Sequence, residues 1–238
     1  MKTEPVSTKP MDTQPVDSLS VRAPHDREGK EPDGKDHGHK DACTRERLIT
    51  STQELLWERG YVGTSPSAIQ ERSGVGQGSM YHHFKGKPAL ALAAIQRNVA
   101  DLHAIAESRF TRSGTALERI TAYLRAPRDI LRGCQAGGLV QDPDIISNAV
   151  LRQPLEELFD YVRLELVGII QSGIDHGEFD PDLHPVNTAD MIAAVVQGGF
   201  VLARVSGDAM PFDRAVTATI DMLRARSRLA DVKRNSLF

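Results

Sequence analysis

The stretch Gly60–Lys87, GYVGTSPSAIQERSGVGQGSMYHHFKGK, predicts two short helices joined by a tight glycine turn. Ser65 can cap the first helix, and Pro66 would occupy its first turn, where a missing N–H costs nothing. Gly74 can supply the left-handed residue that ends this helix. A second helix is expected to begin near Gln77. Two helices of this length across a short glycine-containing turn are typical of a helix-turn-helix unit.

The residues of this hairpin divide between an apolar and a polar face. Met80 and Phe84 lie four apart on one side of the second helix, and with Ile69 and Val75 they can anchor the pair to a small core. The side chains that point away from this core are neutral, short or planar hydrogen-bonding groups, suited to base edges and phosphates rather than to catalysis. On spacing alone, the alternative is an ordinary helical hairpin that binds nothing.

A longer segment, Thr44 to Leu92, closely resembles the amino-terminal DNA-binding domain of TetR-family (tetracycline-repressor-like) transcriptional regulators. The match lies in the leading helix RERLITSTQELLWERGY and in TSPSAIQERSGVGQGSMYHHFKGKPAL, with its Gly-Ser-Met-Tyr-x-x-Phe-x-x-Lys ending. Two residues depart from the family pattern. Gly76 stands where Ser or Thr often caps the recognition helix, a change that should cost about a few tenths of a kcal/mol, and His83 stands where Tyr is frequent.

The resemblance implies that the polar face of the hairpin contacts double-stranded DNA. Lys85 and Lys87 follow the second helix at once, where a backbone phosphate could lie. The expected DNA-binding residues are Thr64, Ser65, Gln77, Gly78, Ser79, Tyr81, His82 and Lys87.

Composition describes an ordinary chain of 238 residues with 40% hydrophobic and 26% charged residues, enough for one sizeable domain or two smaller ones. Cys43 and Cys134 are far apart, so neither a disulfide framework nor a zinc cluster is indicated. The N-terminus lacks an apolar signal-peptide region, and the longest apolar run, Met191 to Ala203, is too short to span a bilayer. We expect a cytoplasmic protein without a membrane partner, a cofactor or a bound metal.

Charge is distributed unevenly along the chain. The net charge is −3, yet residues 43–90 carry six Lys and Arg against four Asp and Glu. The positive charge therefore lies on the segment expected to meet DNA, which gives modest support to that function.

Three domains are predicted from these patterns: 1–42, 43–90 and 91–232. The first is rich in charge of both signs and poor in large apolar residues, so we expect a disordered polar tail. Its histidines, His25, His37 and His39, have no regular ligand spacing, and a solvated tail is the simpler interpretation than a metal site. Entry of this tail into the minor groove is a weaker alternative.

The rest of the chain is predicted to be helical, which makes the fold class all-α: a three-helix DNA-binding domain followed by a larger ligand-binding and dimerisation domain. Apolar spacing and Gly or Pro breaks give the expected bounds. The predicted helices are 44–59, 88–110, 115–132 with a kink near Pro127, 154–176, 186–205 and 211–229, with a loop at 132–144 and a short helix after it.

The last two helices carry apolar stripes and small residues that permit close approach. In TetR-like proteins the two final helices of each subunit form a four-helix dimer interface, and the resemblance implies a homodimer here. The alternative is that both helices are internal core. The expected interface residues are Ala189, Ala193, Val196, Phe200, Val216, Ile220 and Leu223.

The regulatory half of such proteins usually encloses a small-molecule pocket. The expected lining residues are Leu102, Phe110, Tyr123, Phe159 and Gln197, although each has simple core packing as its alternative. Cys134, beside Arg132 in a glycine-rich loop, could sense oxidants if its thiolate is stabilised, while an inert thiol is the simpler interpretation. The acids and histidines of DHGEFDPDLH (175–184) are expected to cap and turn helices rather than to form a catalytic or metal site.

These observations predict a ligand-responsive DNA-binding regulator, in which a homodimeric repressor leaves its operator when a small molecule binds. The repressing sign comes from the resemblance only, so a transcriptional activator of the same fold stays open, as does a helical small-molecule carrier that does not bind DNA. An enzyme is not expected, because no paired nucleophile and base is found and Ser79 lacks the G-x-S-x-G context.

Overall fold

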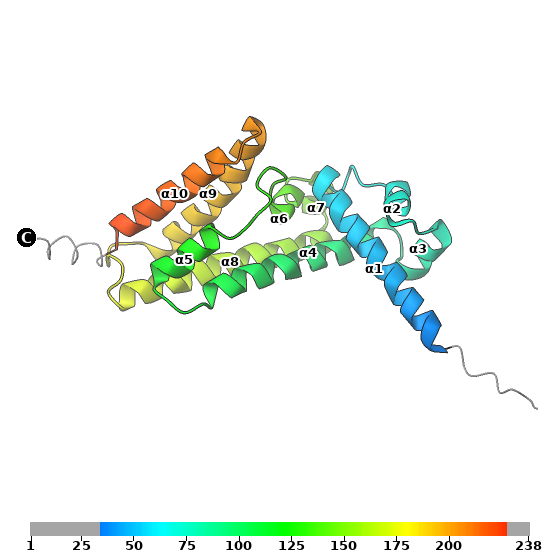
Figure 1. The fold of residues 1–238 in the computed structure, drawn as a ribbon, viewed down its shortest axis with the longest axis horizontal. Coiled ribbons are helices and arrows are strands. Elements are labelled where there is room, and N and C mark those ends of the chain that lie inside the picture. Colours follow the sequence, from blue (N-terminus) through cyan, green and yellow to red (C-terminus); the bar gives the residue numbers. More distant parts are fainter. Residues whose placement is uncertain (1–33, 228–238) are drawn as a thin grey trace, which may run out of the picture.

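The computed structural model describes residues 34–227, whose ten helices, α1–α10, form an elongated molecule (Figure 1). Within these residues the only pairing of extended backbone is an isolated antiparallel bridge between Phe179 and Ser227. The predicted all-α fold, with a helix-turn-helix head and a larger helical body, is confirmed.

The head consists of α1 (Gly34–Arg59), α2 (Pro66–Ser73) and α3 (Gln77–His83), which lie together at one end of the molecule (Figure 1). Apolar side chains of all three helices meet in one small core, because α1 places its apolar stripe against the hairpin. The buried residues of this core are Leu48, Ile49, Leu55, Ile69, Val75, Met80, Phe84 and Leu90.

The helix ends of the hairpin follow the predicted chemistry. The Oγ of Ser65 accepts a hydrogen bond from the N–H of Ala68 at 3.1 Å and so caps α2, and Pro66 occupies the first turn. Gly74 ends this helix with φ 63°, in the left-handed region. Gly76 precedes α3 and provides no side-chain cap.

The first helix begins earlier than predicted. We expected residues 1–42 to form a disordered tail and the helix to start after it, at Thr44, but α1 begins at Gly34. Elongating a nucleated helix adds one hydrogen bond for each residue that is fixed, so a polar segment without an apolar stripe can still continue a helix. Residues 1–33, including His25, lie outside the described part of the chain.

The body contains seven helices and two apolar cores. One core lies between α4, α5, α8, α9 and α10, and the other joins Leu56 and Tyr61 of the head to α4, α6, α7 and α8. The two long helices α4 and α8 run side by side along the body (Figure 1). The helices are α4 (Lys87–Phe110), α5 (Ala116–Leu124), α6 (Gln135–Leu139), α7 (Pro143–Ser147), α8 (Ala149–Asp175), α9 (Pro185–Ser206) and α10 (Met210–Ala225).

The predicted helix at 115–132 is wrong in its second half. The helix α5 ends at Leu124, before Pro127, because proline disfavours a helical conformation in the residue before it and lacks an N–H donor. The guanidinium of Arg128 then donates hydrogen bonds to the carbonyl oxygens of Tyr123, Leu124 and Ala126, at 2.7–3.0 Å. One arginine therefore donates to three carbonyl groups at the end of the helix, and that of Tyr123 also accepts from the N–H of Ala126.

Three other boundaries also differ from the prediction. The expected loop at 132–144 contains α6, which Cys134 caps by accepting a hydrogen bond from the N–H of Gly137 at 3.3 Å. The helix α8 starts at Ala149 rather than at Pro154, since the side chain of Asn148 caps it. The helix α10 ends at Ala225, whereas it was expected to reach Leu229.

The acidic and histidine-rich segment 175–184 has the local roles that were predicted. His176 ends α8 with Nδ1 2.7 Å from the carbonyl oxygen of Ser172, and Gly177 follows with φ 72°. The Nδ1 of His184 accepts a hydrogen bond from the N–H of Asn187 at 3.3 Å and so caps α9. These side chains stabilise the connection between two helices.

Among the described residues, α9 is the one helix whose length and composition would allow it to cross a membrane. Its buried side chains pack against α8 and α10 in the body core, which accounts for the apolar composition. A single helix of this kind is weak support for a membrane span.

Candidate DNA interface and regulatory cavity

The outer face of α3 presents most of the predicted DNA-binding residues to solvent. Gln77, Gly78, Ser79 and His82 are exposed, and the side chain of Tyr81 is 49% exposed although it is large and aromatic. A Cβ atom added to Gly78 would meet nothing within 4 Å, so the surface is open around this residue. The helix therefore offers hydrogen-bonding groups on a face that the described part of the chain leaves open.

The predicted residues outside α3 divide between exposed and buried positions. Thr64 is buried, and its hydroxyl donates to the carbonyl oxygen of Gly60 at 2.7 Å, so its side chain is not available to DNA and that prediction is wrong for the side chain. Ser65 is exposed while it caps α2. The ammonium of Lys87 lies 4.0 Å from the ring centre of Tyr61, a cation–π contact at the edge of the head.

His83 belongs to the structural side of α3. Its side chain is 8% exposed, and its Nε2 lies 3.4 Å from the Oδ1 of Asp41 on the early part of α1. The ring of His83 also packs edge-on against that of His82. The sequence reasoning missed this contact because Asp41 was assigned to the tail.

An inner cavity of about 460 Å³ lies in the body, walled by α1, α4, α8, α9 and the segment 123–136. Four of the five predicted pocket residues line it: Leu102, Tyr123, Phe159 and Gln197. Phe110 does not, because it is fully buried in the core, where its ring centre lies 4.8 Å from that of Tyr123. A second, outer cavity of about 760 Å³ shares Trp57, Cys134, Phe159 and other residues with the inner one.

Burial disfavours the charged forms of two polar groups of the inner wall. Burial is the main cause that lowers the pKa of Arg128 and the main cause that raises the pKa of Tyr123. The guanidinium lies 5.2 Å from the Tyr123 ring centre. Cys134 is a free, half-buried cysteine whose Sγ accepts from the Nε2 of Gln197 at 3.7 Å, between the two cavities.

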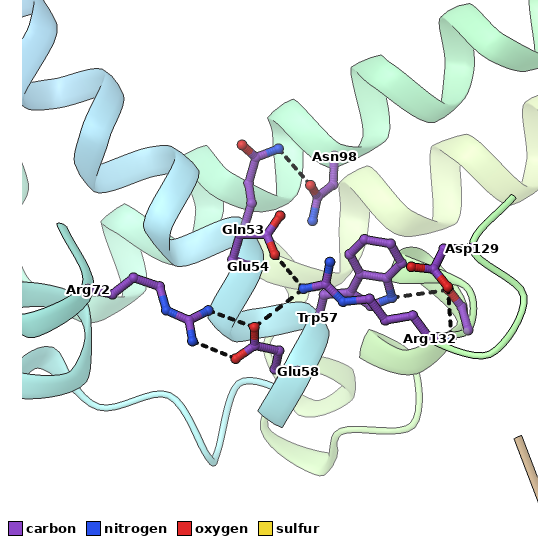
Figure 2. Close-up of polar contacts among 9 residues, drawn as sticks. Gln53, Glu54, Trp57, Glu58, Arg72, Asn98, Asp129 and Arg132 are labelled. Atoms are coloured by element: carbon purple, nitrogen blue, oxygen red, sulfur yellow. Dashed lines mark hydrogen bonds and ion pairs between the residues drawn. The ribbon is translucent and has the colours of Figure 1, made fainter. Parts of the chain in front are cut away.

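The cavity wall is tied to the head through α1 (Figure 2). The guanidinium of Arg132 lies 3.7 Å from the ring centre of Trp57 and forms ion pairs with Glu54 and Glu58. The indole N–H of Trp57 donates to the carbonyl oxygen of Gly133 at 3.1 Å. Three side chains of α1 thereby hold a body segment that lines both cavities.

The same network continues into the hairpin. Glu58 accepts two hydrogen bonds from the guanidinium of Arg72 on α2, at 2.8 and 2.7 Å (Figure 2). These bonds are the largest cause that lowers the pKa of Glu58. The sequence did not reveal this chain of contacts, because Glu58 and Arg132 are far apart in it and no local pattern pairs them.

The predicted dimer-interface residues lie inside the protomer. Ala189, Val196, Phe200, Val216, Ile220 and Leu223 are buried in the body core, and Ala193 lines the inner cavity. Side chains that their own chain already covers cannot form the contact surface of a partner, so this prediction requires correction. The exposed apolar residues of the same two helices are instead Val201, Leu202, Val205, Met210 and Met222.

No group of three or more His, Cys, Asp or Glu side chains in residues 39–227 is placed so that it could hold a metal ion.

Comparison with known proteins places both halves of the chain in one family. Residues 48–94 match the model of bacterial regulatory proteins of the tetR family, and residues 114–219 match that of the tetracyclin repressor-like C-terminal domain. A TetR transcriptional regulator from Chloroflexus aurantiacus J-10-FL has a similar structure, with a TM-score of 0.73, 26% identity and coverage of 79% of this chain and 98% of that chain.

Two curated repressors are similar in sequence. The HTH-type transcriptional repressor DhaR of Mycobacterium sp. strain GP1 is 26% identical over 75% of this chain and 91% of its own. The HTH-type transcriptional repressor NemR of Escherichia coli K12 is 24% identical over 75% of this chain and 92% of its own. With the exposed recognition helix, the cavity behind it and both domain matches, the chain belongs to the TetR family of helix-turn-helix transcriptional regulators.

Proposed function

We propose that the protein is a homodimeric transcriptional repressor whose release from an operator is triggered by a small molecule in the body cavity. The observation that carries this proposal is the position of α1, which belongs to the DNA-binding head and also forms part of the inner cavity wall through Gln53, Glu54 and Trp57. A molecule that fills this cavity touches the head directly.

In this proposal α3 enters the major groove of the operator. Gln77, Ser79, Tyr81 and His82 face the base edges and phosphates, and the absence of a side chain at Gly78 lets the backbone approach closely. Ser65 and Lys87 contact phosphates on either side of the groove. The buried hydroxyl of Thr64 is left out of this set.

The second copy is proposed to pack on the exposed apolar face of α9 and α10. Val201, Leu202 and Val205 are 52%, 57% and 85% exposed and lie within five residues of each other near the end of α9, and Met210 at the start of α10 is 47% exposed. Water contact of such a cluster is unfavourable, and a symmetric copy would cover it. A dimer of this kind can present its two α3 helices to successive major grooves, about 34 Å apart.

Release then follows from the contacts between cavity and head. A ligand that displaces the segment around Arg132 and Gly133 disturbs the bonds that this segment forms with Trp57, Glu54 and Glu58. Because Glu58 also holds Arg72 of α2, the change reaches the hairpin and alters the position of α3. The ligand acts by favouring a state in which the two heads no longer fit the operator.

The test is binding of the purified protein to DNA from upstream of its own coding region and of adjacent genes, compared with a scrambled duplex over a salt series. We expect specific binding that Tyr81→Ala weakens at least tenfold, while Gln171→Ala on the exposed face of α8 has no effect. A reporter gene behind the bound segment should be repressed.

Equal, salt-sensitive binding to both duplexes would indicate non-specific affinity only. Absence of binding by a folded dimer would contradict the proposal and favour a carrier that does not bind DNA.

A further inference from the structure

One buried side chain of the inner cavity has a hydrogen-bond donor without a partner. In residues 39–227 three buried side-chain atoms lack hydrogen-bond partners, namely His83 Nε2, Asn98 Nδ2 and Arg109 Nε. Of these three residues, only Asn98 lines the inner cavity, and it is 2% exposed. A buried donor of this kind is unfavourable unless something accepts its hydrogen bond.

The orientation of the Asn98 amide follows from its other contact. Its Oδ1 accepts a hydrogen bond from the Nε2 of Gln53 on α1 at 2.7 Å, which leaves Nδ2 as the free end. Figure 2 shows the Asn98 oxygen facing the Gln53 nitrogen, with the Asn98 nitrogen at the other end of the amide. The unpartnered group of this wall residue is therefore an N–H donor.

The rest of the wall is mainly apolar and aromatic. A ligand that fits against this wall presents mainly flat aromatic or aliphatic surface to it, with few further polar groups. The apolar and aromatic lining residues include Trp57, Leu102, Tyr123, Leu158, Phe159 and Phe200.

Three of the charged side chains at the cavity wall already form hydrogen bonds or ion pairs within the protein. Arg128 donates to three carbonyl oxygens, and Glu54 pairs with Arg132. Asp129 accepts a hydrogen bond from the N–H of Arg132 at 3.2 Å, and Asp101 is exposed at the rim. A ligand therefore does not have to supply a charge to neutralise the site.

We propose that the inner cavity binds an uncharged aromatic molecule whose carbonyl oxygen accepts a hydrogen bond from Asn98 Nδ2. This inference deepens the proposed function, because it states the chemical class of the effector. Gln53 and Asn98 connect α1 to α4, so the bound oxygen acts on the pair of helices that joins the head to the body.

The test uses three pairs of probes in which CH₂ replaces C=O: acetophenone and ethylbenzene, benzophenone and diphenylmethane, deoxybenzoin and bibenzyl. Binding to the full chain is measured by isothermal titration calorimetry in the absence of DNA. We expect at least one ketone to bind about tenfold more tightly than its hydrocarbon, the effect of one net hydrogen bond.

The variant Asn98→Asp keeps an oxygen for Gln53 and replaces the free donor by an acceptor, so it should abolish the ketone preference. Asn98→Leu removes the donor without adding a charge and serves if the first variant does not fold. Glu107→Gln, further along α4 at an exposed position outside the cavity wall, is the matched control and should keep the preference.

Three results would overturn the inference: no binding of any ketone, equal binding of ketones and hydrocarbons, or a preference that persists in both Asn98 variants. Because DNA is absent from the titration, a protein that binds ketones through Asn98 but no operator would contradict the proposed function alone. A protein that binds its operator but shows no ketone preference would contradict this inference alone.

Discussion

Neighbouring hydroxyl groups at the start of α2 have opposite roles. Thr64 turns inward to the carbonyl oxygen of Gly60, whereas Ser65 faces solvent and caps the helix. The next helix, α3, begins after Gly76 and has no side-chain cap. The N-terminus of the recognition helix is therefore less stabilised than that of α2, because no side chain accepts a hydrogen bond from its first N–H groups. This helix has only seven residues.

This difference predicts opposite effects of two cap substitutions on stability. Ser65→Ala removes a cap and should lower the free energy of unfolding by about 1 kcal/mol. Gly76→Ser adds a cap at a residue with φ −67°, where a Cβ meets nothing within 4 Å, and should raise it by about a few tenths of a kcal/mol. Urea unfolding followed by circular dichroism measures both, and a stabilising Ser65→Ala would contradict the capping role.

The ion pair of Glu58 predicts a pH dependence in the same part of the head. Hydrogen bonds from Arg72 lower the pKa of Glu58 below its ordinary value of 4.5 in the folded state. The contribution to stability is therefore present above pH 4.5 and is lost as the pH falls through the folded pKa. Melting temperatures of the wild type and Glu58→Gln should differ at neutral pH and converge in acid; a constant difference would argue against the pair.

At the scale of elements, the segment between α5 and α6 determines the shape of the regulatory site. Pro127 prevents α5 from continuing, and Arg128 stabilises its end. The chain that follows separates the two cavities and carries Arg132 to Trp57. If residues 115–132 formed one continuous helix, Arg132 would not reach Trp57 and the segment would not line both cavities in this way.

Arg128 should therefore be important for stability as well as for the cavity. Arg128→Ala removes hydrogen bonds to three carbonyl oxygens, of which only that of Tyr123 keeps another donor, the N–H of Ala126, and should lower the free energy of unfolding by about 2 kcal/mol. Arg125→Ala, at the exposed C-cap of the same helix, is the control and should change it by less than about 0.5 kcal/mol. Equal effects of the two substitutions in thermal unfolding would show that Arg128 does not stabilise the end of α5.

For the whole molecule, the proposed dimer would present two heads to DNA and would depend on the surface that joins its two copies. Leu202→Glu places a charge in the exposed apolar cluster and should convert the dimer to a monomer with an intact fold. Leu164→Glu on α8 changes an equally exposed leucine, 62% against 57%, outside that cluster, and should leave the dimer intact. Analytical ultracentrifugation measures the outcome, and a Leu202→Glu dimer would place the interface elsewhere.

The sequence predicted those parts of the fold that depend on neighbouring residues. Ser65, Pro66 and Gly74 act within one turn, so the bounds of the hairpin could be inferred from them. The inward stripe of α9 was assigned to a partner because this helix is apolar on more than one face, and only the packing of α8 and α10 decides which face is covered. Long-range pairs such as Gln53 and Asn98 have no local signal at all.

Trp57 is the only tryptophan in the chain, and it lies in the walls of both cavities beneath Arg132. The tryptophan fluorescence of the protein therefore comes from a single side chain, which lies at the contact between the head and the body. An aromatic ketone bound next to the indole should quench the emission, and separation of Arg132 and Gly133 from the ring should shift the emission maximum to longer wavelength. Stopped-flow recording of both signals would give the order of ligand entry and head release without any added label.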